Sequence, residues 1–184
     1  SKIINFSSYY VYDDVGLCGE ESNTTKKYNY CRQKLEEEEE LLNKNNHISF
    51  RVGKLFGHKN INKQNKLTEY IIKNDNLKLD NILFNSTSLR QVLKIIKYEL
   101  KNNNLFGIYN LSNNGYISHY EYGCYINENL GGIKQIEQVN NIGKSFDNYG
   151  KFLMDTSKLN NMFKLTDWRK DIDFYLKELN LINE

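Results

Sequence analysis

The sequence predicts an α/β fold built on a parallel sheet. Three observations carry this prediction. The order strand, helix, strand over Ile3 to Val52 is that of a parallel crossover unit. An amphipathic helix follows, with its apolar residues on one stripe: Leu89, Val92, Leu93, Ile96 and Leu100. The next apolar run, Gly107 to Leu111, is then expected as a strand that returns to the same sheet.

Each element of the first unit has its own signal. Ile3 to Ser7 is a short apolar run that ends on small hydroxyl residues, as a parallel strand does when it delivers side chains to its carboxyl edge. A loop is expected over Asp13 to Lys27, and a helix with a solvated glutamate face over Tyr28 to Leu42. Ile48 to Val52 is the second strand, and the chain turns away from it over Gly53 to Gly57.

The second half alternates shorter helices and strands, and two helices carry a start signal. Ser118 and Glu121 have the spacing of a capping box, and Asp167 is expected to cap the last helix. The other expected segments are a helix over Leu67 to Ile72, a strand or extended segment over Leu77 to Phe84, a strand over Ile133 to Val139, a loop over Gly143 to Lys151 and a helix over Thr156 to Phe163.

Composition points to a globular protein and to no particular partner. The 184 residues suffice for one domain with a substantial core. The net charge is only +2 and the lysines are scattered, which argues against nucleic-acid binding. No apolar run approaches the roughly 20 residues of a membrane span, and nothing at the start resembles a signal peptide. We therefore expect a cytoplasmic protein that does not bind membranes.

Neither the cysteines nor the histidines indicate a metal site. The three cysteines are too few and too far apart for a disulfide framework or a metal-binding pair, so reduced thiols are expected. The histidines lack the spacing of metal ligands and are expected on the surface or in loops; they are His47, His58 and His119.

The candidate site joins the end of the first strand to the start of the first helix. Tyr30 and Lys34 are four residues apart and share one helix face, where a hydroxyl from Ser7 or Ser8 can join them. An ammonium beside a phenol favours the phenolate and lowers the tyrosine pKa, as an acid/base working near neutral pH requires.

The same pair also fits a purely structural interpretation. With 14 tyrosines and 21 lysines in the chain, chance predicts about 1.6 such Tyr-x-x-x-Lys pairs, and the sequence contains one. A tyrosine packed in the core beside a solvated lysine explains Tyr30 and Lys34 equally well. Arg51 likewise fits either a buried ion pair or an edge charge.

Five segments, in one order along the chain, carry a family resemblance. They are Phe6–Tyr12, which resembles the strand motif STDYVF; Tyr30–Glu38, which resembles the helix motif YGxxKxxxE; Phe50–Gly57, which resembles iRtxxvyG; Gly107–Ser112, which resembles GiyhLs; and Met154–Lys158 with Trp168, which resembles LDtsK…W. These motifs belong to the extended short-chain dehydrogenase/reductases (NAD-dependent epimerase/dehydratase), and the last is similar to the dTDP-4-dehydrorhamnose reductase branch.

The resemblance implies a fold and an activity. The fold is the C-terminal half of a Rossmann-like doubly wound parallel sheet plus a small substrate-binding α/β lobe. The activity is reduction of a 4-keto-6-deoxy sugar nucleotide with NAD or NADP as cofactor. Two alternatives remain: an NAD-dependent sugar-nucleotide epimerase or dehydratase, and a non-catalytic regulatory homologue of the same fold. A homodimer is compatible with each of these functions.

The resemblance also implies a role for each aligned residue. Tyr30 would be the general acid that protonates the substrate carbonyl oxygen, and Lys34 would hold the nicotinamide ribose and tune Tyr30. Ser8 would donate a hydrogen bond to the same oxygen, with Ser7 as a weaker candidate. Thr87 aligns with a family residue that lies near the sugar nucleotide. Its position just before Leu89 favours a different role, as the cap of the helix that starts there.

The resemblance implies a division of the chain as well. Residues 1–57 would hold the catalytic part of the sheet, 58–104 substrate-lobe elements and a return helix, 105–112 the returning strand, and 113–184 the C-terminal substrate lobe. No glycine-rich dinucleotide turn follows any expected strand, so the N-terminal dinucleotide-binding half is expected to be absent from this chain. We therefore expect an exposed sheet edge and no cofactor binding by the chain alone.

Departures from the family pattern bear on the substrate. Tyr9 stands where the family usually has aspartate, and Asn148 and Tyr149 stand where arginine and proline are common in the rhamnose-forming reductases. These differences leave the identity of the sugar open.

Overall fold

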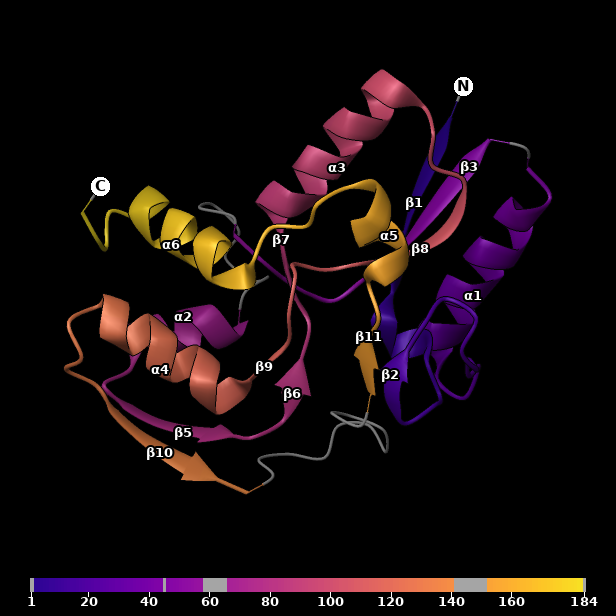
Figure 1. Ribbon diagram of the computed structural model, residues 1–184. Helices are drawn as coiled ribbons and strands as arrows, with labels where there is room; N and C mark the ends of the chain where they lie inside the picture. The colour runs from indigo at the N-terminus through magenta and orange to yellow at the C-terminus, as the bar shows by residue number, and fades with distance from the viewer. Residues whose placement is uncertain (1, 45, 58–65, 141–151, 184) are drawn as a thin grey trace.

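The computed structural model describes residues 2–44, 46–57, 66–140 and 152–183. One end of the molecule holds a parallel sheet of three strands in the order β1-β3-β8, namely β1 (Ile3–Ser8), β3 (His47–Val52) and β8 (Gly107–Leu111). The expected parallel α/β architecture is confirmed (Figure 1).

Helices cover both faces of this sheet. Every residue of β3 is buried, and alternate side chains of a strand point to opposite faces. Ile48 and Phe50 pack in one hydrophobic cluster with Val92 and Ile95 of α3 (Leu89–Asn102). Arg51 instead pairs with a residue of α1 (Asn29–Leu42). The sheet is therefore a middle layer between α1 and α3.

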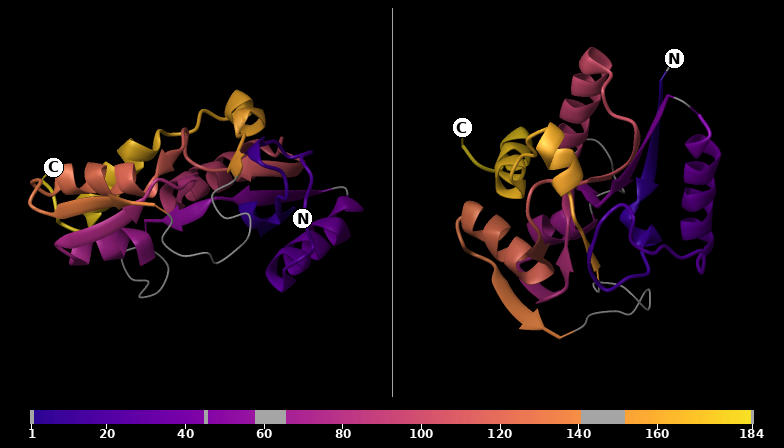
Figure 2. Two further views of the ribbon diagram at one scale, coloured as in Figure 1. Left: turned by 90° about the horizontal axis from the view of Figure 1, so that it is seen from below. Right: turned by 45° about the vertical axis from the view of Figure 1, so that its right-hand side comes forward.

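A second group of elements forms the lobe at the other end of the molecule (Figures 1 and 2). Its two parallel strands are β5 (Asn76–Asp80) and β10 (Gln135–Val139). Its helices are α2 (Lys66–Lys73), α4 (His119–Asn129) and α6 (Trp168–Glu178). Their inward faces share one hydrophobic core that includes Ile71, Ile126, Trp168 and Ile172. We call this group the substrate lobe, after the role that the sequence predicts for it.

Short strand pairs and single turns complete the chain. The pairs are β4 (Lys54–Phe56) with β7 (Ser86–Ser88), β2 (Gly16–Cys18) with β11 (Phe152–Met154), and β6 (Leu83–Phe84) with β9 (Ile117–Ser118); the short helical segments are η1 (Tyr9–Val11) and α5 (Ser157–Met162). Two of these strands correct the sequence expectations. β2 lies inside the expected loop and β4 inside the expected turn. The segment expected as a strand or extended over residues 77–84 contains β5 and β6.

Side-chain caps fix three helix starts. Ser118 and Glu121 form the expected capping box of α4, and Asp167 accepts a hydrogen bond from the Arg169 amide at the start of α6. At α3 the cap is Ser88, whose Oγ accepts a hydrogen bond from the Gln91 amide, so the expectation that Thr87 caps this helix is wrong.

A sheet edge was expected to be exposed, and in the part of the chain that the structure describes the outer edge of β1 is such an edge. β1 pairs only with β3 there, and Ile3 and Phe6 are 41% and 38% exposed. None of the helices in that part is long and apolar enough to cross a membrane.

The histidines depart from expectation. His47 and His119 are buried, at 1% and 7% exposure, so their expected place on the surface or in loops is wrong. His58 lies outside the described residues, as does the whole of the loop expected over Gly143 to Lys151, which includes Asn148 and Tyr149.

Candidate active site

The two candidate serines are the last residues of β1, and both are buried. The Oγ of Ser8 accepts a hydrogen bond of 3.3 Å from the Tyr10 amide and so starts the turn η1. The Oγ of Ser7 has no hydrogen-bond partner among the described residues. A buried hydroxyl without a partner carries a desolvation cost, which a bound ligand can remove.

Tyr30 and Lys34 lie on the outer side of α1, as their spacing predicts. The opposite side of this helix buries Cys31, Leu35 and Glu38. Tyr30 is 47% exposed, and the Nζ of Lys34 lies 2.8 Å from a carboxylate oxygen of Glu37. The phenol and the ammonium are therefore both accessible from solvent.

One contact holds the start of α1 against the segment that follows Ser8. The Sγ of Cys31 donates a hydrogen bond of 3.1 Å to the backbone carbonyl of Tyr10. Tyr30 directly precedes this cysteine, so the phenol lies on the helix turn that packs on the carboxyl end of β1. The side chains of Ser8, Tyr30 and Lys34 form no hydrogen bonds with one another.

A buried network fixes α1 on the sheet. Arg51 donates to the Glu38 carboxylate through Nε and Nη2, at 3.0 and 2.7 Å, and through Nη1 to the Glu20 carbonyl at 2.9 Å. Burial alone would lower the pKa of Arg51, but the hydrogen bonds and charge of Glu38 raise it above its ordinary value. Arg51 is thus a buried ion-pair partner, which settles the alternative that the sequence left open.

The guanidinium of Arg51 also lies over the ring of Tyr12, 5.0 Å from its centroid. The Tyr12 hydroxyl donates a 2.6 Å hydrogen bond to Asn110 on β8. Burial raises the pKa of Tyr12 to about 12, against the opposing effect of Arg51. This phenol stays protonated in the working pH range and has a structural role.

Thr87 lies apart from these residues. It is fully buried in β7, and its Oγ1 donates a 3.0 Å hydrogen bond to the carbonyl of Leu111, the last residue of β8. The hydroxyl joins β7 to the three-stranded sheet.

Sequence reasoning missed a polar chain beside β4. The Nζ of Lys54 lies 2.8 Å from Nε2 of His119, whose Nδ1 lies 2.8 Å from a carboxylate oxygen of Asp80. Burial lowers the pKa of Lys54 to about 8, although Asp80 opposes this shift. Burial and the Lys54 charge also lower the pKa of His119. We call this set the Lys54 chain. The capping box placed His119 at a helix start, but no sequence signal linked it to the other two residues.

The side chains at the carboxyl end of β1 fit part of a nicotinamide cofactor and a carbonyl substrate. The unpartnered Ser7 hydroxyl, the Ser8 hydroxyl, the exposed Tyr30 phenol and the Lys34 ammonium are donors suited to ribose and carbonyl oxygens. The segment Gly16–Cys18 is a strand paired with β11, so this glycine does not open a phosphate-binding turn.

Comparisons with known proteins give one family match and a set of similar folds. A family model described as "RmlD substrate binding domain" matches residues 1–181. The search of curated proteins found no match. Among solved structures, a dTDP-4-dehydrorhamnose reductase from Clostridium acetobutylicum is 19% identical with a TM-score of 0.79, over 98% of this chain and 66% of that one.

Two further structures are similar. A dTDP-4-dehydrorhamnose reductase from Yersinia enterocolitica is 21% identical with a TM-score of 0.77, over 96% of this chain and 66% of that one. An ADP-L-glycero-D-manno-heptose-6-epimerase from Helicobacter pylori is 19% identical with a TM-score of 0.77, over 99% of this chain and 61% of that one. At such identities the likeness shows the fold. The chain spans between 61% and 66% of the length of these three structures.

Proposed function

The chain belongs to the RmlD substrate-binding domain family, and on that premise we propose that it carries the catalytic side chains and the substrate lobe of an NAD(P)-dependent sugar-nucleotide reductase. The substrate class that we propose is a 4-keto-6-deoxy sugar nucleotide. Two of the similar solved structures are dTDP-4-dehydrorhamnose reductases, which supports this class.

The observation that carries the proposal is the position of Tyr30. Its phenol is solvent-accessible on α1, next to Cys31, which bonds to the segment directly after Ser8. A substrate at the carboxyl end of β1 would therefore have a hydroxyl on one side and a phenol on the other.

Each side chain has one step in the proposed reaction. The nicotinamide, when bound, supplies the hydride to the carbonyl carbon of the sugar. Tyr30 gives its hydroxyl proton to the carbonyl oxygen, which becomes the alcohol of the product. Ser8 donates a hydrogen bond to that oxygen and stabilises the charge that develops on it. Lys34 holds the cofactor ribose and favours the phenolate that Tyr30 leaves behind.

Ser7 and Thr87 are the proposed substrate contacts, and their environments differ. Ser7 has a buried hydroxyl with no partner among the described residues, which favours it as a ligand contact. The Thr87 hydroxyl already bonds to Leu111. Thr87 would need to exchange that bond for one to the substrate, so Ser7 is the stronger of the two.

An epimerase is the second candidate, favoured by the similarity to the heptose epimerase structure. Cofactor turnover separates the two. A reductase consumes NADPH or NADH. An epimerase returns the hydride to the sugar, so the amount of reduced cofactor does not change.

The test is an assay of the natural full-length protein with a dTDP-4-keto-6-deoxy sugar and either nicotinamide cofactor. Loss of absorbance at the reduced-nicotinamide band with formation of the alcohol supports a reductase. Conversion of the sugar without cofactor loss supports the epimerase. Absence of both, with the nucleotide still bound, would contradict an enzymatic function.

A further inference from the structure

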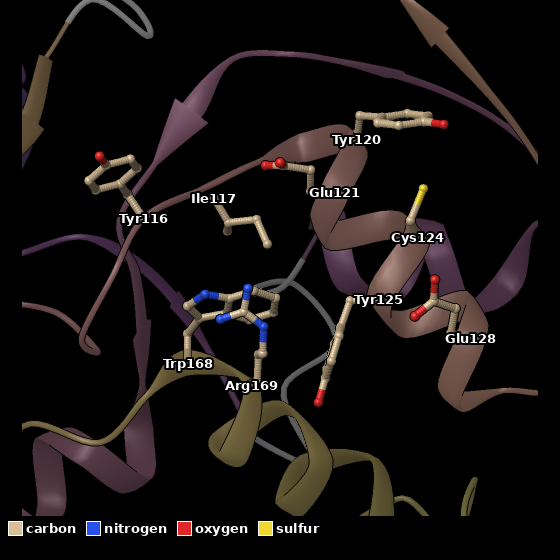
Figure 3. A pocket seen from close by; sticks show the side chains of 9 residues that line it. All are labelled: Tyr116, Ile117, Tyr120, Glu121, Cys124, Tyr125, Glu128, Trp168 and Arg169. Carbon is tan, nitrogen blue, oxygen red and sulfur yellow. The ribbon is translucent and has the colours of Figure 1, made fainter.

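The substrate lobe contains a pocket that takes no part in the proposed reaction. It has a volume of about 310 Å³ and lies between α4 and the first turn of α6 (Figure 3). Pockets that bind small molecules begin at about 300 Å³. The pocket is large enough for a small organic molecule.

Aromatic side chains form much of its wall. Tyr116, Tyr120 and Tyr125 line it from the loop before α4 and from α4 itself, and Trp168 lines it from α6. The rings of Tyr125 and Trp168 meet edge to face, with centroids 5.0 Å apart. The Tyr125 hydroxyl donates a 2.7 Å hydrogen bond to Asp173, which ties α4 to α6. The wall that presents these rings is thereby held in place from both helices.

Two carboxylates and one cation also line the pocket. Glu121 accepts hydrogen bonds through Oε2 from the backbone and hydroxyl of Ser118. Glu128 is exposed and forms no ion pair with any residue that the structure describes. The charged side chains that line the pocket therefore carry a net charge of −1, which one bound cation would neutralise.

The cation is Arg169, and its guanidinium lies over the ring of Trp168, 4.4 Å from the centroid (Figure 3). A tryptophan face is the strongest aromatic site for a cation. The chain thus places its own guanidinium where a bound organic cation would be attracted.

Arg169 is held loosely in that position. Its side chain is 53% exposed, and its carboxylate partner Asp167 is 3.6 Å away. An exposed ion pair of this kind contributes little to stability. A ligand cation can therefore displace the guanidinium at a small cost.

We propose that this pocket binds an organic cation, an ammonium or guanidinium group on an apolar stem. The charge takes the place of the Arg169 guanidinium on the Trp168 face, and the carboxylates of Glu128 and Glu121 balance it. The stem lies against the tyrosine rings. The binding is independent of the proposed reductase reaction, because none of these residues belongs to the candidate active site.

Trp168 makes the test direct, because it is the only tryptophan in the chain. Its fluorescence is measured while choline is added at constant ionic strength. The uncharged analogue 3,3-dimethyl-1-butanol is the matched probe for the stem. We expect a saturable change with choline and a response at least tenfold weaker with the alcohol.

Variants then assign the charge contacts. Arg169→Ala removes the competing cation, so choline should bind more tightly. Glu128→Gln should weaken binding about two- to fivefold, as expected for one exposed charge pair. Glu36→Gln on α1 removes another exposed carboxylate, outside the pocket, and should leave binding unchanged. Circular dichroism checks that each variant is folded.

Three results would overturn the proposal. The first is an equal response of the wild type to choline and to the alcohol. The second is no saturable response to choline even with Arg169→Ala. The third is competition between inorganic phosphate and choline, which would make Arg169 an anion site. If Arg169→Ala does not fold, chemical-shift mapping of the choline contacts in the wild type decides, because the shifts must centre on Trp168 and Glu128.

Discussion

Glu38 and Arg51 form a buried ion pair that joins α1 to β3, with a distance of 2.7 Å and exposures of 3% and 4%. The same helix presents Tyr30 and Lys34 on its outer side. Because the ion pair holds α1 on the sheet, it also sets the position of the Tyr30 phenol relative to the carboxyl end of β1.

Replacing Glu38 with glutamine should destabilise the protein strongly. The change leaves the Arg51 guanidinium buried with no full counter-charge, and breaking such a pair costs about 3–5 kcal/mol. Urea unfolding measures the loss. Glu39→Gln is the matched control, since Glu39 pairs with Lys26 at 2.7 Å on the surface, where both are about half exposed. Similar small losses for both variants would contradict the structural role of the buried pair.

Adding a methyl group at Gly53 should disturb the junction of the sheet with the substrate lobe. A Cβ there would lie 2.4 Å from the backbone carbonyl oxygen of Asn85. That oxygen cannot move freely, because it accepts a 2.8 Å hydrogen bond from the Lys54 amide. Gly53→Ala should cost about 1–3 kcal/mol. Gly19→Ala, which meets nothing within 4 Å, is the control. Thermal unfolding with equal midpoints for the two variants would rule out this close approach.

The Lys54 chain predicts a pH dependence of stability. The pKa of Lys54 is about 8 in the fold and 10.5 as the ordinary value. Below pH 8 both states carry the charge, and the folded state bears the full cost of burying it. Between pH 8 and 10.5 the lysine is mostly neutral in the folded state and mostly protonated in the unfolded state. Unfolding therefore takes up a proton in this range, so the free energy of unfolding rises with pH.

The measurement is a comparison of the wild type with Lys54→Met between pH 7.5 and 9.5. The free energy of unfolding of the wild type should increase relative to the variant by about 2 kcal/mol over this range. Taking the difference removes the titration of other lysines and tyrosines. A difference that stays level, or that moves the other way, would show that the Lys54 ammonium is not desolvated.

Local sequence patterns predicted the secondary structure well wherever residues close in sequence determine it. The parallel pairing of β1 with β3 followed from two apolar runs separated by a helix, and the capping box at Ser118 located the start of α4. Ser88 and Thr87 both carry a hydroxyl before α3, and only the backbone decides which one reaches the Gln91 amide.

The remainder depends on contacts between distant residues. Lys54 and His119 are 65 positions apart, and Asp80 and His119 are 39 apart, so no periodicity links them. The pairing of β2 with β11 likewise joins residues 16–18 to 152–154, and neither segment is long enough to show a strand pattern. At the candidate active site, the Tyr30 and Lys34 spacing gave their common helix face, but the unpartnered Ser7 hydroxyl emerged only from the packing.

The central claim is that Tyr30 is the general acid of hydride transfer, and the substitution Tyr30→Phe in the natural full-length protein tests it most directly. Tyr70→Phe, which removes a similarly exposed hydroxyl on α2, is the control. We predict that Tyr30→Phe lowers kcat by about 100-fold or more, while nicotinamide binding and Tyr70→Phe turnover stay near wild type. Turnover by Tyr30→Phe equal to the wild type would contradict the assignment.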